Sequence, residues 1–318
     1  MGRFAARRLG RMAVTLTLAT FVFFSAVTVL PGDPIRALFG FSPPPPELYE
    51  QIRQQFHLDE PLPTQYVLYM GDLVRGDLGH SFPDNPFGRS QLGRPVSATL
   101  RATLPVSLRI LGLTILIQAV AGLGLGVLAT LRRGRVAGVA VYATAVVLVA
   151  TPVLVAGIVL QSVMAYELSW LPYQWVNRGG WTNYVLPIAA LSAGSAAYTI
   201  LLTRAELTAT LRRPFVAAAV ARGIAAPRVV GIHALRASLV PVVAFVTANL
   251  GSLIAGLVVV EGVFNVPGAG GALFRALRQQ DRALIMVVIM LTLMAVIVVN
   301  ALADLVYSII DPRIRRTD

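Results

Sequence analysis

The sequence predicts an all-α protein that crosses a membrane several times. Three observations indicate this class: 56% of the residues are apolar and only 13% are charged, the apolar residues gather in long uncharged runs, and arginine is unevenly distributed between these runs. Soluble domains have a smaller apolar share and a larger charged share. The chain has no cysteine, which excludes disulfides, thiolate metal sites and cysteine-ligated iron–sulfur clusters.

Six uncharged apolar runs have about the length that a membrane-spanning helix requires. A hydrocarbon core about 30 Å thick needs roughly 20 helical residues. The runs are residues 12–30, 110–131, 136–166, 181–203, 237–260 and 283–303. The first run is longer than the apolar part of a signal peptide, so we expect a retained helix. The third run exceeds one crossing and contains Pro152, which predicts a kink or a re-entrant piece.

The distribution of arginine predicts the orientation of the chain. All 27 basic residues are arginine. Sixteen of them, with three acids, lie in the N-terminus, the loop after the second run, the loop at residues 204–236 and the C-terminus, whereas the other loops hold eleven of each. Basic residues in short loops stay on the cytoplasmic side of the membrane. We therefore expect both termini and the loop at residues 204–236 to be cytoplasmic.

The predicted organisation has three parts. Residues 1–30 form a cytoplasmic N-terminus and the first transmembrane helix, residues 31–99 form an extracytoplasmic insertion, and residues 100–318 form a core of five further transmembrane helices. The cytoplasmic loop at about residues 204–236 belongs to this core.

The insertion is predicted to have structure of its own. Residues 47–56 have helical composition, and Thr64 is expected to be the N-cap of a second helix. Gly71, Gly76 and Gly79 predict turns where this second helix ends. Such an insertion either shields the ends of the transmembrane helices or serves as a docking platform for a soluble partner or for substrate delivery.

The absence of lysine limits the chemistry that the chain can perform. A P-loop requires a lysine to neutralise the β and γ phosphates, and a Schiff base also requires a lysine. The chain has none, so we do not expect an enzyme. His57, His80 and His233 are far apart in the sequence, and no metal-ligand spacing occurs, so no metal site is expected.

Six short motifs occur in order along nearly the whole chain. They are LPGDP at residues 30–34, HLDEPLPTQY at 57–66, RGDLGHSF at 75–82, LSWLP at 168–172, EGVFNVPGAGG at 261–271 and DLVYSIIDPRIR at 304–315. With these motifs in this order, the sequence resembles the permease subunits of dipeptide and oligopeptide ABC importers. It is most similar in layout to the subunit of the pair with the larger external insertion.

This resemblance implies a fold, a function and a set of partners. The implied fold is that of a type I ABC importer permease in the bacterial plasma (inner) membrane, and the implied function is to form half of the translocation path for peptides. The implied partners are a homologous second permease subunit, one or two ATP-binding subunits that hold ATP and Mg, an extracytoplasmic substrate-binding protein and membrane lipid, with no nucleic acid. The chain itself would bind no cofactor. Related permeases also serve nickel chelates and haem, so these substrates stay open.

The loop at residues 204–236 contains a seventh match. In the permeases that the sequence resembles, a pattern of Glu-Ala-Ala, three residues and Gly forms a short coupling helix that seats in a cleft of the ATP-binding subunit. Here Ala217, Ala218 and Ala219 occupy the first three positions and Gly223 the last. Alanine is small and favours helix, and Gly223 suits a left-handed exit from a short helix. The candidate coupling residues are Pro214, Phe215, Val216, Ala217, Ala218, Ala219, Arg222, Gly223 and Arg228.

The contacts of this helix are expected to differ from those of the family pattern, because alanines replace its polar residues. We expect apolar packing by Phe215 and Val216, with charge contacts by Arg212, Arg213 and Arg222 at the rim. The alternative for the basic loop is contact with anionic lipid.

Further candidate sites lie on the outer side and within the apolar runs. The candidates for docking of the binding protein or for substrate entry are Asp77, Leu78, Gly79, His80, Ser81, Glu261 and Asn265. Asp304, in the last run, either acts as a proton or ion site or pairs with a loop arginine near the inner interface. Arg109, at the outer end of the second run, either lines the mouth of the path or extends its side chain to the interface.

A carrier driven by an ion gradient is the alternative function, with Asp304 as the coupling group. The sequence shows no inverted repeat of run lengths and no interrupted helix, which argues against a carrier. Gly122, Gly124 and Gly126 in the second run, and Gly251 with Ala255 in the fifth, predict close helix packing.

Overall fold

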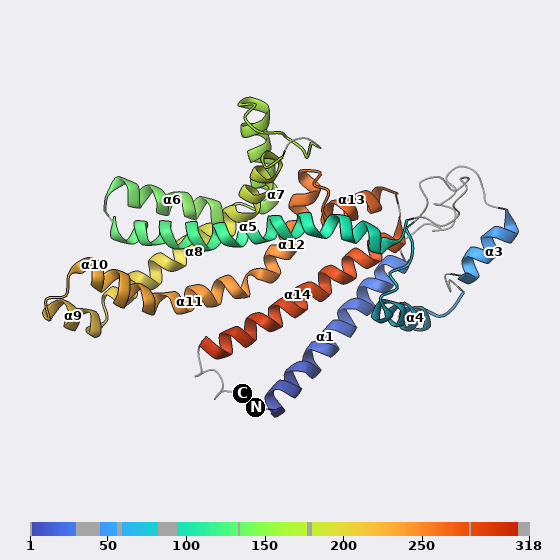
Figure 1. Ribbon diagram of the computed structural model, residues 1–318, viewed down its shortest axis with the longest axis horizontal. Helices are drawn as coiled ribbons and strands as arrows, with labels where there is room; N and C mark the ends of the chain where they lie inside the picture. The colour runs from blue at the N-terminus through green and yellow to red at the C-terminus, as the bar shows by residue number, and fades with distance from the viewer. Residues whose placement is uncertain are drawn as a thin grey trace. The chain divides into compact units, whose positions relative to one another are not determined.

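The computed structural model describes residues 2–29, 45–55, 59–81, 94–132, 134–176, 180–279 and 281–310, and it is helical over most of them (Figure 1). The chain divides into two compact units. The first contains Met1–Val106 and Pro267–Ile297, and the second contains Ser107–Val266 and Val298–Asp318. An all-α fold is therefore confirmed for the described part of the chain, where an isolated bridge between His80 and Pro95 is the one β pairing.

The first unit contains α1 and the helices of the predicted insertion. Its helices are α1 (Gly2–Val29), α3 (Pro46–Gln55), α4 (Leu62–Arg75), the beginning of α5 (Val96–Leu131), α13 (Ala269–Gln279) and the first part of α14 (Arg282–Ile310). The two helices expected within the insertion are thus present as α3 and α4. Helix α5 begins at Val96, well before the second apolar run, because the mixed polar and apolar residues from 96 to 109 continue the same helix.

Aromatic side chains join α1 to α4. The rings of Phe21 and Phe24 in α1 meet the buried Tyr66 of α4 edge to face, with centroids 5.2 and 5.6 Å from its ring. The hydroxyls of Tyr66 and Thr20 share a hydrogen bond of 2.8 Å. Buried aromatic pairs contribute more than their area alone, so Tyr66 anchors α4 on the first helix.

The ends of α4 correct two predictions. The N-cap is Pro61 rather than Thr64, and the amide of Thr64 donates to the Pro61 carbonyl over 2.9 Å within the first helical turn. Prolines are favoured at the start of a helix because the first amides have no helical acceptor. Gly71 lies inside α4, so no turn occurs there. Gly76 ends the helix with φ of 82°, and Gly79 has φ of 68°, as expected for turns.

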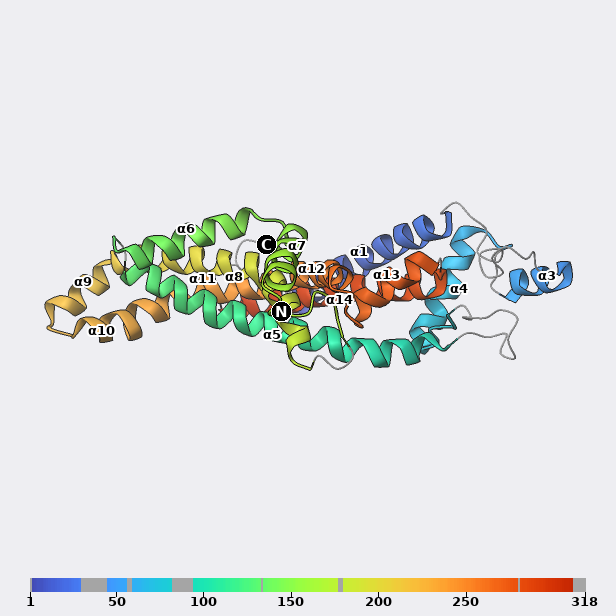
Figure 2. The same ribbon diagram turned by 90° about the horizontal axis from the view of Figure 1, so that it is seen from above.

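The second unit is built around α8. Its helices are the rest of α5, α6 (Val136–Ala150), α7 (Val153–Leu160), a π-helical turn (Gln161–Glu167), α8 (Thr182–Leu211), α9 (Pro214–Ala221), α10 (Ala226–Arg228), a second π-helical segment (Val229–Ala234), α11 (Leu235–Ala248), α12 (Leu250–Val263) and the end of α14. Helices α6, α7 and α11 all pack on α8, and Figures 1 and 2 show α6, α8 and α11 side by side. The elements α9 and α10 lie at the far end of α8 and α11 (Figure 1).

Glycines bring α5 close to α8. A Cβ atom on Gly122 would lie 2.6 Å from the side chain of Thr199, and one on Gly126 would lie 2.6 Å from that of Thr203. Close packing was predicted for both glycines and is confirmed. Gly124 has open space at its Cβ position, because a residue two positions away points to another side of the helix, so it makes no close contact with α8.

Several helices are long and apolar enough to cross a membrane. Within the described residues there are four, covering residues 96–131, 182–211, 226–248 and 282–303. The number rises to five if α6 and α7, which are bent by 113° relative to each other, count together as one crossing. The bend follows Thr151, whose backbone is extended, because Pro152 disfavours helical geometry in the residue before it. The prediction of a kink or a re-entrant piece at Pro152 is thus confirmed as a sharp bend, which fits either arrangement.

The expectation that no helix is interrupted was wrong. Besides the bend at Pro152, the fifth apolar run is divided at Asn249 into α11 and α12. Asparagine and the nearby Gly251 are weak helix formers. A Cβ atom on Gly251 would lie 2.4 Å from the side-chain oxygen of Asn300 in α14, so this glycine also permits a close helix approach, as predicted.

Candidate functional site

Helix α9 forms from strong local signals. The backbone of Arg213 is extended, and Pro214 begins the helix, where its missing amide costs no hydrogen bond. At the other end, the amide of Gly223 donates to the carbonyl of Val220 over 2.9 Å. Gly223 has φ of 75°, a left-handed conformation that glycine adopts most readily. The short helix and its left-handed exit are both as expected.

The inner face of α9 is buried in the chain itself. Val216 and Ala219, one turn apart, are 4% and 8% exposed. They form an apolar cluster with Leu207 of α8 and with Val229 and Ala234 of the segment after α10. This cluster fastens α9 to the end of α8.

The outer face of α9 consists mainly of alanine. Successive helical residues are about 100° apart, which places the exposed Ala217, Ala218 and Ala221 opposite the buried face. Phe215 and Val220, at 43% and 58% exposed, flank these alanines. We call Ala217, Ala218 and Ala221 the alanine strip.

Two of the candidate coupling residues cannot contact a partner in this conformation. Val216 was expected to pack against another subunit, but it is buried against α8, and Ala219 is buried with it. The physical reason is that the helical period places both residues on the side that the apolar cluster occupies. Pro214, Phe215, Ala217, Ala218, Arg222, Gly223 and Arg228 are exposed.

Four arginines lie close in sequence to the alanine strip, before and after α9. Arg212, Arg213, Arg222 and Arg228 are exposed, and none of them forms an ion pair within the described residues. The strip therefore presents small side chains, and the exposed arginines beside it in the chain are positively charged. Such a surface allows close approach of a partner with acidic groups at its edge.

Polar side chains of the candidate entry loop, residues 77–81, form hydrogen bonds within the chain. A carboxylate oxygen of Asp77 accepts from the amide of Gly79 over 2.9 Å. The hydroxyl of Ser81 donates to the buried carboxylate of Asp281, which also caps α14 by accepting from the amide of Leu284. Asp77 and Gly79 are exposed, whereas Leu78, His80 and Ser81 are half-buried.

The two other candidate entry residues have opposite environments. Glu261, at the end of α12, is fully buried, so its side chain cannot contact a docking protein in this conformation. Its position follows from α12, where Leu253, Leu257 and Val260 share the buried side. Asn265 is exposed and has φ of 49°, and it stays a candidate.

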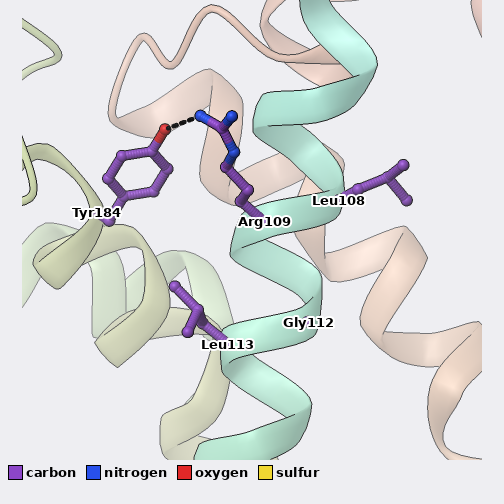
Figure 3. Close-up of a pocket in the computed structure, with 5 residues that line it drawn as sticks. All are labelled: Leu108, Arg109, Gly112, Leu113 and Tyr184. Atoms are coloured by element: carbon purple, nitrogen blue, oxygen red, sulfur yellow. Dashed lines mark hydrogen bonds between the residues drawn. The ribbon is translucent and has the colours of Figure 1, made fainter.

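Arg109 lies in a pocket with apolar walls. Its guanidinium donates to the hydroxyl of Tyr184 over 3.5 Å (Figure 3). Leu108, Gly112 and Leu113 complete the lining of this cavity of about 430 Å³. Arg109 therefore has a specific partner, Tyr184 of α8. This contact is compatible with both predicted roles, lining the mouth of the path and reaching to the membrane interface.

A polar seam between α5 and α8 was not expected. The fully buried amide of Gln118 donates to the hydroxyl of Thr199 over 3.3 Å. The hydroxyls of Thr114 and Thr203 are buried without a hydrogen-bond partner in the described part of the chain. The sequence does contain a signal: Thr114, Gln118, Gly122 and Gly126 recur every four residues, which places them on one face of α5.

Some candidates lie beyond the described structure. Asp304 is within α14, but its side chain is outside the part that is described. The motifs at residues 30–34 and 311–315, and His57, are outside the described residues as well. In the described residues, no cluster of three potential metal ligands occurs.

The apolar helices and the basic loop define an integral membrane protein with several crossings. Comparison with known proteins identifies its class. Residues 122–316 match the model of the "binding-protein-dependent transport system inner membrane component" family, and residues 1–111 match the model of the N-terminal part of such membrane components.

Proteins with similar sequences agree with this match over their whole length. A glutathione transport system permease protein of Escherichia coli (strain K12) is 31% identical over 315 residues, which cover 99% of both chains. A probable peptide ABC transporter permease protein of Sinorhizobium fredii (strain NBRC 101917 / NGR234) is 30% identical over 325 residues, which cover 99% of this chain and 100% of that protein. The chain belongs to the family of binding-protein-dependent transport system inner membrane components. It is a multi-pass inner membrane protein and a permease subunit of an ABC importer.

Proposed function

We propose that this permease forms half of a translocation path for dipeptides or oligopeptides. Its pair is a homologous second permease subunit, and an extracytoplasmic binding protein delivers the substrate. Separate ATP-binding subunits, which hold ATP and Mg, supply the work. The names of the two relatives, one for glutathione and one for peptides, support this substrate class.

The observation that carries the proposal is the construction of α9. Its alanine strip is exposed, exposed arginines precede and follow it in the chain, and its inner face packs on Leu207 of α8. A well-packed apolar contact transmits displacement because it resists compression. A movement of α9 by an ATP-binding subunit would therefore move α8 rather than bend the loop. The proposed contact surface for the ATP-binding subunit consists of the exposed candidate residues between Pro214 and Arg228. The buried Val216 and Ala219 do not belong to it.

The proposed topology has six crossings, with both termini in the cytoplasm. Helix α1 is the first crossing, α5 the second, the bent pair α6 and α7 the third and α8 the fourth. Helices α11 and α12 together form the fifth, and α14 forms the sixth. The excess of arginine in the N-terminus, the loop of α9 and the C-terminus supports this orientation.

Reconstitution into proteoliposomes tests the proposed function. The permease, purified with the subunits that copurify with it, should take up a labelled dipeptide or oligopeptide only with ATP inside and a binding protein outside. An unlabelled peptide should compete, whereas a nickel chelate or haem should not. Uptake by the chain alone, driven by an ion gradient without any ATPase, would contradict the proposal.

A further inference from the structure

Near the predicted cytoplasmic end of α8, three polar side chains lie one above another. Arg204, Thr208 and Arg212 are spaced by four residues, so they share a face of the helix. Together with Tyr142 of α6 they line a cavity of about 520 Å³. The other walls are apolar and come from Leu201, Ala205 and Ala209.

Tyr142 holds one of the two arginines in place. The guanidinium carbon of Arg204 lies 3.8 Å from the centre of the Tyr142 ring. Such a cation–π contact fixes the plane of the guanidinium. The N–H groups at its edge remain able to donate, since stacking uses the face of the group.

The cavity lacks a negative counter-charge. Neither Arg204 nor Arg212 forms an ion pair within the described residues. Glu206 is the nearest acid in the sequence, but it is about 200° around the helix from Arg204 and does not line the cavity. Two cations and one hydroxyl therefore converge on a space that an anion can fill.

The depth of the cavity indicates where such an anion would come from. Arg204 directly follows the apolar run at residues 181–203. Thr208 and Arg212 are roughly 6 and 12 Å further along the helix at 1.5 Å per residue. The headgroup layer on each side of a bilayer is roughly 5–8 Å thick. The cavity thus extends from the edge of the hydrocarbon region through the headgroup layer.

We propose that this cavity binds the phosphate of an anionic phospholipid of the cytoplasmic leaflet. Arg204 and Arg212 bind the phosphate oxygens with charge-assisted hydrogen bonds, and Thr208 donates a further one. The apolar wall at Leu201 and Ala205 lies beside the beginning of the acyl chains. This site shares Arg212 with the basic residues near the alanine strip, and it does not depend on which substrate the permease transports.

The test compares two lipids and two double variants. The full chain is purified in detergent with the subunits that copurify with it, depleted of lipid and titrated with phosphatidylglycerol or phosphatidylcholine of the same acyl chains. Bound lipid is counted by native mass spectrometry. The pocket variant is R204Q/R212Q, and the control is R132Q/R135Q, which removes the same charge from an exposed cytoplasmic loop.

The wild type should prefer phosphatidylglycerol, and the pocket variant should bind it at least about tenfold more weakly. The control should stay within about twofold of the wild type. Thr208→Val, which keeps both charges, should also weaken binding, and it provides a second measurement if the pocket variant does not assemble. Equal losses in both double variants, or no preference between the lipids, would overturn the site. Displacement of the lipid by inorganic phosphate at similar concentrations would show that the cavity takes a soluble anion instead.

Discussion

At the scale of single residues, Gly223 decides how the chain leaves α9. Its φ of 75° is a conformation in which a Cβ atom strains the backbone, although no neighbour lies within 4 Å of that position. The cost of a substitution would therefore come from the backbone and not from a clash.

Gly223→Val should reduce ATP-dependent uptake. A β-branched residue in the left-handed region costs roughly 1–2 kcal/mol, so the exit from α9 should change and weaken the proposed contact with the ATP-binding subunit. Uptake in proteoliposomes should fall at least about fivefold, since 1 kcal/mol corresponds to that factor, while the chain still inserts into the membrane. Gly231→Val is the control, because Gly231 is exposed, has open space and has no positive φ. Normal uptake by Gly223→Val would contradict the assigned role of this residue.

Tyr66 and Tyr69 offer a matched pair in α4. Tyr66→Phe breaks the hydrogen bond to Thr20 and should cost about 1 kcal/mol. The hydroxyl of Tyr69 is buried without a partner in the described part of the chain, so Tyr69→Phe should be neutral or stabilising. Thermal unfolding in detergent should show a lower midpoint, by roughly 2–4 °C, for Tyr66→Phe alone.

The burial of Tyr69 also predicts a dependence of stability on pH. Burial raises the pKa of Tyr69 above the ordinary value of about 10. The unfolded chain therefore loses this proton first, and stability falls as pH rises above about 10. Tyr69→Phe should remove this part of the loss at high pH, whereas an unchanged pH profile would contradict the buried environment of Tyr69.

At the scale of helices, the sequence predicts which helices exist better than it predicts where they end and which of their faces are buried. The apolar runs and Pro152 predicted the long helices and the bend after α6, because composition and proline act locally. The break at Asn249, the burial of Val216 and that of Glu261 were missed, since each depends on which neighbour packs on the helix. The N-cap of α4 was misplaced because the prolines near its start outweighed the capping preference of Thr64.

The contact between α5 and α8 can be tested with neighbouring glycines. Gly126→Ala places a Cβ atom 2.6 Å from the side chain of Thr203, and such overpacking should cost about 1–3 kcal/mol. Gly124→Ala, with open space at its Cβ position, should leave stability unchanged or raise it by up to about 1 kcal/mol, because alanine favours helix. Thermal unfolding of both variants in detergent gives the comparison, and equal effects would show that the glycine face is assigned incorrectly.

At the scale of the whole molecule, the family match shows a multi-pass permease, and the distribution of arginine predicts its orientation. The absence of cysteine makes the proposed orientation directly testable with single introduced cysteines. In intact spheroplasts an impermeant thiol reagent should label Gln54→Cys in α3 and should not label Ala218→Cys in α9. Both should react after permeabilisation. Labelling of Ala218→Cys from outside would show that the proposed orientation is wrong.

We propose that the ATP-binding subunits act through the alanine strip, so a bulky residue there tests the account most directly. Ala218→Trp is compared with Ala137→Trp, which changes an exposed alanine at the start of α6. Copurification of the ATP-binding subunit with the tagged permease is the measurement. We predict that Ala218→Trp weakens the association at least about fivefold, as overpacking of a close contact implies, and that Ala137→Trp changes it less than about twofold. Undiminished copurification with Ala218→Trp would contradict the assignment of α9 as the coupling helix.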